Sequence, residues 1–344
     1  MARMLDRLLQ RGVEGDVDFR AWAQASGLTT CERIVVDNVS DYFYAHAGKT
    51  VWDWVADFPN LAPPFDTFWM EANAPRTVRD AHGKPISTPP EAQHRATGVM
   101  AAGVRKPDEM SPGEFVLMLA DAWGFMRAGV VIANDLLDAP VRWALAFSIF
   151  LEDRLSQFQF VGNRILWLDG EGRLLDIPGR TSEQRIQGIW TVLGPPFLTH
   201  AWRERHGAEA AWEAQRFISS MLSPYGLALS LMHCKNVEIR PAPTPERVRD
   251  RRHRHRRPAL TYRVLEIEPM KRVLRSEGRI AETGMRLALH ICRGHFKDYR
   301  QRGLFGKLRG IYWWDSHLRG DLRSGVAVKD YEIAPLAAAT GGIP

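Results

Sequence analysis

The sequence predicts an α+β fold with a small N-terminal helical layer, a β-rich middle, a long helix, and a basic antiparallel β module at the C-terminus. Three observations predict it. Apolar residues recur at helical spacing near the N-terminus and again before residue 232, short aromatic runs between prolines and glycines fill the middle, and basic residues gather in the last third. With 344 residues, of which 45% are hydrophobic and 25% charged, the chain is long enough for two domains and is not disordered throughout.

The N-terminal layer is expected to contain three helices, over residues 3–10, 16–25 and 31–47. In the third, Ile34, Val35, Val39, Tyr42 and Phe43 recur at helical spacing.

The middle of the chain is expected to be a set of strands joined by turns. A surface loop rich in proline covers residues 75–95, and Asp169-Gly170 between two apolar arms predicts a hairpin over 164–177. The expected strands are 51–55, 65–71, 97–104, 114–126 and 141–151.

Two helices follow, over residues 182–193 and 208–232, the second with a break at Pro224. Beyond them the composition changes, which divides the chain into a body, an exposed linker rich in proline and arginine, a basic β module and a tail. These parts are residues 1–239, 240–258, 259–333 and 334–344, and the module's strands are expected at 260–267, 286–299, 310–314 and 326–333.

The net charge of +6 is unevenly distributed along the chain. Residues 241–344 hold 22 Lys and Arg against 11 Asp and Glu, whereas residues 1–240 hold 24 against 29. A basic module of this kind predicts a polyanionic partner, most often nucleic acid. The mildly acidic body is expected to act as a scaffold or to bind a protein partner.

The densest group of candidate functional residues lies between His290 and Tyr331. If residues 291–299 form a strand, Arg293, His295, Lys297 and Tyr299 share one face. Leu287, Leu289 and Ile291 have the same parity, so either a bulge near Gly294 switches the faces or one half of the segment is not a strand. Arginine and lysine bind phosphate, and aromatic rings stack on bases, so RNA or single-stranded DNA is the expected ligand. The expected nucleic-acid contacts are Arg251, Arg252, Arg254, Arg256, Arg257, Arg293, Lys297, Tyr299, Lys307, Arg309, Tyr312, Trp313, Trp314, Arg319 and Lys329.

Two other functions stay open. His295 and His317 could act as the acid and base of a metal-independent nuclease or phosphotransfer enzyme, or the protein could be a structural or inhibitory protein that binds another protein. No metal site is predicted, because His290, Cys292, His295 and His317 lack a second close ligand pair. No cofactor is predicted, because neither a Walker A loop nor a GxGxxG motif is present.

Several segments together resemble a family of uncharacterised proteins met in bacteriophage and prophage genomes. They are Pro59-Asn-Leu-Ala-Pro-Pro-Phe65, His233-Cys-Lys-Asn-Val237, Arg293-Gly-His-Phe-Lys297, Leu304-Phe-Gly306, Tyr312-Trp-Trp314 and Arg319-Gly320. The resemblance implies a bacterial or phage cytoplasmic setting and carries no activity, cofactor or functional residue.

The cysteines and the N-terminus agree with a cytoplasmic location. The three cysteines are far apart and form no CxxC pair, so no disulfide framework is predicted. The first twelve residues carry charge throughout, unlike a signal peptide, and polar residues interrupt the longest apolar region, 128–150. We therefore predict no membrane segment.

Overall fold

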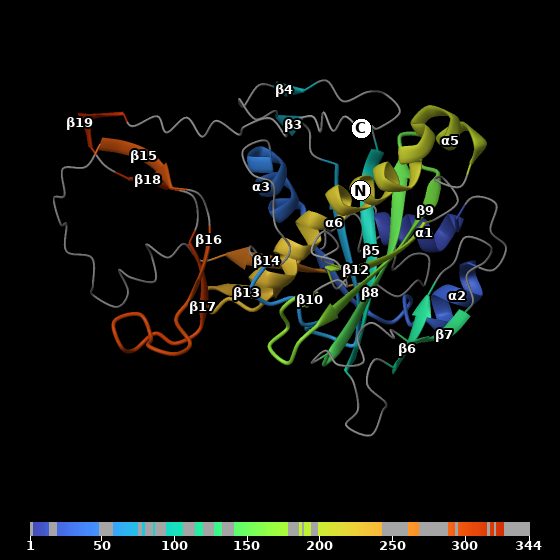
Figure 1. Cartoon of the computed structure of the whole chain (residues 1–344), viewed down its shortest axis with the longest axis horizontal. Helices are drawn as coiled ribbons and strands as arrows, with labels where there is room; N and C mark the ends of the chain where they lie inside the picture. The colour runs from blue at the N-terminus through green and yellow to red at the C-terminus, as the bar shows by residue number, and fades with distance from the viewer. Residues whose placement is uncertain are drawn as a thin grey trace, which may run out of the picture. The chain divides into compact units, whose positions relative to one another are not determined.

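The chain forms two compact units, residues 1–267 and 268–344, in this computed structural model (Figure 1). The residues that the structure describes are 3–13, 19–47, 58–74, 78–79, 85–86, 94–105, 114–119, 127–132, 141–177, 186–187, 189–193, 199–242, 261–267, 288–292, 295–314, 317–319 and 321–326.

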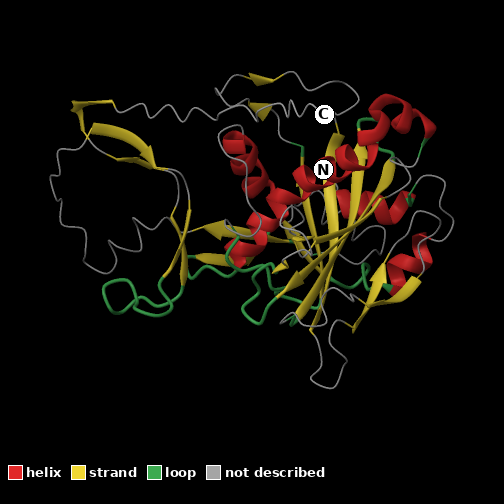
Figure 2. Cartoon of the chain, in the orientation of Figure 1, coloured by secondary structure: helices red, strands yellow, loops and turns green. Residues whose placement is uncertain are grey.

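The first unit is built on an eight-stranded mixed sheet (Figure 2). In spatial order the strands are β12 (Ile189–Leu193), β9 (Phe158–Leu168), β8 (Trp143–Asp153), β5 (His94–Arg105), β2 (Thr67–Asn73), β1 (Glu32–Val35), β14 (Arg263–Ile267) and β13 (Val237–Pro241). Strands β12 to β2 in this order pair antiparallel, β2 with β1 and β1 with β14 pair parallel, and β14 with β13 pairs antiparallel.

Helices cover the sheet, and three short antiparallel pairs accompany it. The helices are α1 (Met4–Arg11), α2 (Phe19–Ala25), α3 (Asp37–Ala47), α5 (His200–His206), a 3₁₀ turn (Gly207–Glu209) and α6 (Ala210–Met232). The pairs are β3 (Val78–Arg79) with β4 (Pro85–Ile86), β6 (Glu114–Leu119) with β7 (Arg127–Ile132), and β10 (Asp176–Ile177) with β11 (Ile186–Gln187).

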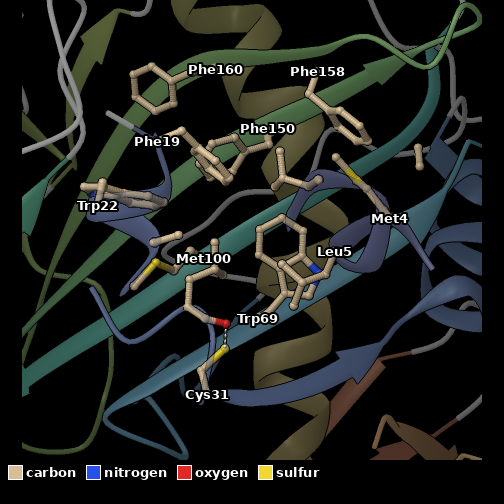
Figure 3. Close-up of a cluster of buried hydrophobic side chains, with 14 residues drawn as sticks. Met4, Leu5, Phe19, Trp22, Cys31, Trp69, Met100, Phe150, Phe158 and Phe160 are labelled. Carbon is tan, nitrogen blue, oxygen red and sulfur yellow. Dashed lines mark hydrogen bonds between the residues drawn. The ribbon is translucent and has the colours of Figure 1, made fainter. Parts of the chain in front are cut away.

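Helices α1 and α2 pack on one face of the sheet and enclose an aromatic core (Figure 3). The Phe150 ring lies at its centre, with its centroid 5.7 Å from that of Trp22 and 5.9 Å from that of Trp69. The indole of Trp69 lies over Gly98, where a Cβ atom would overlap the ring. Gly98 is therefore required by the close approach of a large side chain.

Helix α6 packs on the opposite face, because Thr97 and Gly98 are neighbours in β5 and so lie on opposite sides of the sheet. The Tyr225 hydroxyl donates to the Thr97 carbonyl at 2.8 Å, and the Arg164 guanidinium of β9 donates to Ser219 Oγ at 2.7 Å. Burial lowers the pKa of Arg164 to about 10. These contacts fix α6 against two strands.

A buried carboxylate fixes the start of α1. Glu71 of β2 accepts hydrogen bonds from the backbone N–H groups of Met4 and Leu5, at 3.1 and 2.9 Å, and from Trp69 Nε1 at 2.9 Å. The first N–H groups of a helix have no partner within the helix and lie at its positive end, so an anion there is favourable. Burial nevertheless raises the pKa of Glu71.

The structure confirms the α+β class, the long helix and several of the predicted strands. Residues 65–71, 97–104 and 141–151 correspond to β2, β5 and β8, and the helix over 208–232 is α6, which continues through Pro224 without a break. The chain reverses direction at Asp169–Gly172, as predicted, with the Asp169 N–H donating to the Arg173 carbonyl at 3.0 Å. The predicted strand 51–55 lies outside the described residues, as do most of the linker and the tail.

Two helix predictions are wrong. Residues 31–47 are not one helix, because Glu32–Val35 form β1 and α3 begins at Asp37. A strand between two parallel neighbours is buried on both faces, so its apolar residues mimic a helical pattern. Residues 182–193 contain β11 and β12 instead of a helix. The β-branched and aromatic run Ile189–Leu193 pairs with the edge of β9.

The predicted domain boundary also moves. The strand over 260–267, assigned to the basic module, is β14 and lies in the large sheet between β1 and β13. Counted over the two units, residues 1–267 hold 32 basic and 32 acidic side chains, and residues 268–344 hold 14 and 8. The first unit is therefore neutral overall, and the excess of +6 belongs to the second.

Gly98→Ala is expected to destabilise the first unit by about 1–3 kcal/mol, because the new methyl group overlaps Trp69 and neither side of the contact is free to move. Urea unfolding followed by tryptophan fluorescence measures the change. Gly170→Ala is the control, since its nearest neighbour is Arg142 Cγ at 3.6 Å, and it should change stability by less than about 0.5 kcal/mol. Equal effects of the two substitutions would contradict the packing described for Trp69.

Glu71→Gln is expected to change how stability depends on pH. Because burial raises the pKa of Glu71 above its ordinary 4.5, the folded state holds this proton more tightly than the unfolded chain does. The stability from that proton is complete below pH 4.5 and is lost as the pH rises through the raised pKa. The wild type should therefore lose stability relative to the variant as the pH rises above 4.5 in urea titrations. Parallel curves would contradict this assignment.

Candidate nucleic-acid interface

The described residues of the second unit include five strands, which form two small sheets. Strands β16 (His295–Asp298) and β17 (Ile311–Trp314) form an antiparallel pair. Strand β15 (Ala288–Cys292) lies between β18 (His317–Arg319), which is antiparallel to it, and β19 (Asp321–Val326), which is parallel.

One register runs through both antiparallel pairs. His295 lies opposite Trp314, and Cys292, three residues before His295, lies opposite His317, three residues after Trp314. Two residues therefore lie between the paired positions on each of the two chain segments, so the two pairs have the same register. Residues 293–294, with the predicted bulge at Gly294, lie outside the described residues. We refer to β15 and β16 paired with β18 and β17 as the ribbon.

One face of the ribbon combines a cation with aromatic rings. Lys297 lies opposite Tyr312, and its Nζ atom is 4.3 Å from the centroid of the Trp314 ring. The Tyr299 and Tyr312 rings have centroids 6.1 Å apart. Alternate side chains of a strand share a face, which correctly predicted that His295 and Lys297 lie on the same face of β16. Their cross-strand partners on that face are Trp314 and Tyr312.

The aromatic residues that were expected to stack on bases differ in how far they are exposed to solvent. Tyr312 and Trp313 are only 5% and 2% exposed, and Trp313 packs on Phe296 with ring centroids 4.7 Å apart. Neither ring is accessible to a base, so this part of the prediction is wrong. Tyr299 and Trp314 are half-buried, and burial raises the pKa of Tyr299 while the nearby Trp314 indole opposes that shift.

The loop that joins β16 to β17, residues 299–310, is held by its own backbone hydrogen bonds. We call it the tip loop (Figure 1). The Tyr299 N–H donates to the Gly310 carbonyl at 2.8 Å and closes its base. Leu304 and Leu308 exchange N–H to carbonyl bonds of 2.8 and 3.1 Å and close its end. The loop therefore has a defined shape, with Phe305-Gly306-Lys307 at its end.

Cations dominate the tip loop and the strands beside it. From His295 to Trp314 the chain contains five Lys and Arg residues and a single acid, Asp298. Asp298 pairs with Arg300 at 2.7 Å. The side chains of Arg302, Lys307 and Arg309 are exposed and make no hydrogen bond or ion pair with the described residues. They are exposed cations on a loop whose backbone hydrogen bonds close it.

The sequence analysis predicted Lys307 and Arg309 as nucleic-acid contacts. It did not single out Arg302 or Phe305, which lie in the same loop. The signal that could have found them is the pair Gly303 and Gly306, which flank Leu304-Phe305 and both adopt a positive φ, 69° and 73°. Two glycines three residues apart in a loop indicate a tight reversal that presents the residues between them.

Some of the predicted contacts lie outside what the structure describes. These are Arg251, Arg252, Arg254, Arg256, Arg257, Arg293 and Lys329. Arg319 and His317 are described by their backbone in β18.

The two histidines of the proposed catalytic pair are not register partners. His295 lies opposite Trp314, and His317 lies opposite Cys292. The nuclease alternative stays a prediction.

The side chains of Cys31 and Cys234 are buried and that of His233 is half-buried, and all three are hydrogen-bonded in the first unit. His233 Nε2 lies 2.8 Å from the Ala62 carbonyl, and burial lowers the pKa of His233. Burial raises the pKa of Cys31 to about 11 and that of Cys234 to about 12, so neither thiol is a nucleophile at neutral pH. Within the described part of the chain, no group of three or more His, Cys, Asp or Glu residues could hold a metal ion.

Two of the segments that carry the phage resemblance contact each other. Ser230 Oγ donates to the Asn60 carbonyl at 3.0 Å, and the Leu61 N–H donates to the Gly172 carbonyl at 2.7 Å. Together with the His233 contact to Ala62, these bonds fasten residues 59–65 to the end of α6 and to the turn after β9. Their role is structural.

Comparison with protein-family models, with curated proteins and with solved structures finds no match for the chain. The phage resemblance therefore stays a prediction. Among the described helices, none is both long and apolar enough to cross a membrane.

Proposed function

We propose that this protein binds RNA or single-stranded DNA through the tip loop and the adjoining end of the ribbon. The observation that carries the proposal is the trio Arg302, Lys307 and Arg309, which is exposed and lacks ion pairs among the described residues, on a loop fixed by its own hydrogen bonds.

Electrostatics favours a polyanion at this loop. Three cations held near one another repel, and a phosphate backbone relieves that repulsion while releasing its condensed counterions. Arginine offers a two-pronged donor to phosphate oxygens, and lysine a point charge. Because Asp298 already pairs with Arg300, no carboxylate of the described tip loop and its strands competes for these three cations.

The aromatic residues favour a single strand over a duplex. Tyr299 and Trp314 are half-buried beside Lys297, and Phe305 lies at the end of the tip loop. Rings of this kind stack on bases whose faces are open, as they are in single strands and RNA loops. In a duplex those faces are covered by neighbouring base pairs.

Replacing Arg302, Lys307 and Arg309 together by Gln is expected to weaken binding to a mixed-sequence single-stranded oligonucleotide and to reduce its salt dependence. Each phosphate contact contributes about 0.7 to the slope of log K against log salt concentration for single strands, so the slope should fall in magnitude by about 2. Fluorescence anisotropy titrations at several KCl concentrations measure both quantities.

The matched control replaces Arg20, Arg203 and Arg205 by Gln. These arginines are exposed on α2 and α5 in the first unit, so the control changes the net charge equally and should leave the slope almost unchanged. Equal loss in the two variants would show that binding depends on overall charge and not on the tip loop. A wild-type protein without salt-dependent binding would overturn the proposed function.

A further inference from the structure

Phe305 is more exposed than the leucines of the tip loop. Its side chain is 54% exposed, whereas Leu304 and Leu308 of the same turn are half-buried. Large exposed hydrophobic side chains are rare among the described residues, and the others, Leu155 and Trp212, lie in the first unit. The turn thus separates its apolar residues, directing two inward and one outward.

The backbone at Phe305 is unusual for a residue with a large side chain. Phe305 has a φ of 55°, in the left-handed region that normally favours glycine, and Gly306 follows with a φ of 73°. A left-handed conformation at an aromatic residue is unfavourable and persists only where the surrounding hydrogen bonds impose it. Here the hydrogen bonds between Leu304 and Leu308 impose it, so the backbone of the loop sets the direction in which the Phe305 side chain leaves the chain.

The charged neighbours of Phe305 indicate what its ring contacts. Lys307 is two residues away, and Arg302 and Arg309 lie on either side of the turn, all three exposed. An apolar protein partner would have to strip water from these cations, at a large cost in free energy. A nucleic acid satisfies both features, since its phosphates bind cations while its bases offer flat apolar faces.

We propose that Phe305 is a base-stacking residue, on which one unpaired nucleobase of a bound strand stacks while Arg302, Lys307 and Arg309 bind the flanking phosphates. This inference rests on the proposed function and specifies its ligand as an unpaired nucleobase. A phenyl ring has no hydrogen-bonding group, so the contact does not select one base by hydrogen bonding. Because hydrogen bonds already hold the loop backbone, little ordering of the backbone accompanies binding.

The test compares two oligonucleotides of twelve nucleotides with identical phosphate backbones, one of mixed sequence and one entirely abasic. The wild type should bind the base-containing strand about 10-fold more tightly, a ratio that reflects stacking. Phe305→Ala should reduce this ratio at least fivefold and leave the salt slope unchanged. Phe305→Trp should preserve the ratio, because indole also presents a flat aromatic face.

Leu155→Ala is the control, because Leu155 is a 79% exposed residue of a turn in the first unit, and it should leave the ratio unchanged. A Phe305→Ala protein that keeps the full ratio overturns the stacking inference and leaves the proposed function intact. A wild type that binds neither strand overturns the proposed function itself. Equal affinity for a duplex and for the single strand, with both lost in Phe305→Ala, also overturns the inference, since the ring would then act between stacked base pairs.

Discussion

A charged side chain can leave water only where hydrogen bonds or an opposite charge replace its hydration, and the first unit satisfies this condition at three buried positions. Glu71 accepts the first N–H groups of α1, Glu152 accepts Arg7 Nε at 2.8 Å, and Arg164 donates to α6. Each of these bonds joins a helix, α1 or α6, to a strand of the sheet. In the tip loop, by contrast, Arg302, Lys307 and Arg309 stay in water. These three buried charges hold helices against the sheet of the first unit, whereas the cations of the tip loop are accessible to a partner.

The elements predicted from sequence include long ones, helix α6 and strands β2, β5 and β8, and also the short strands β14 and β17. Helix α6 has an apolar stripe at helical spacing, and the strands are apolar runs between turn residues. Strands β1 and β12 were missed because the pattern of each depends on its neighbours. At the candidate site, the period of two placed His295 and Lys297 on one face, but no local signal shows that Tyr312 and Trp313 are buried. Burial depends on packing between strands, which the sequence alone does not specify.

The motif-rich segments of the sequence separate into two kinds once the contacts are known. Residues 59–65 and 233–237 bond to each other and to the turn after β9, so their distinctive composition reflects packing. The end of the segment 299–310 is closed by backbone hydrogen bonds of its own, and Arg302, Lys307, Arg309 and Phe305 are exposed there. Composition alone does not separate the two kinds of segment.

Photo-crosslinking tests the central claim most directly, because it asks where on the chain a single strand lies. The wild-type protein is irradiated with a single-stranded RNA that carries 4-thiouridine at every uridine, and the modified peptides are identified by mass spectrometry. If the tip loop is the contact, the modified residues fall within 299–310, with Phe305 among them. Crosslinks confined to other segments of the chain would contradict the account.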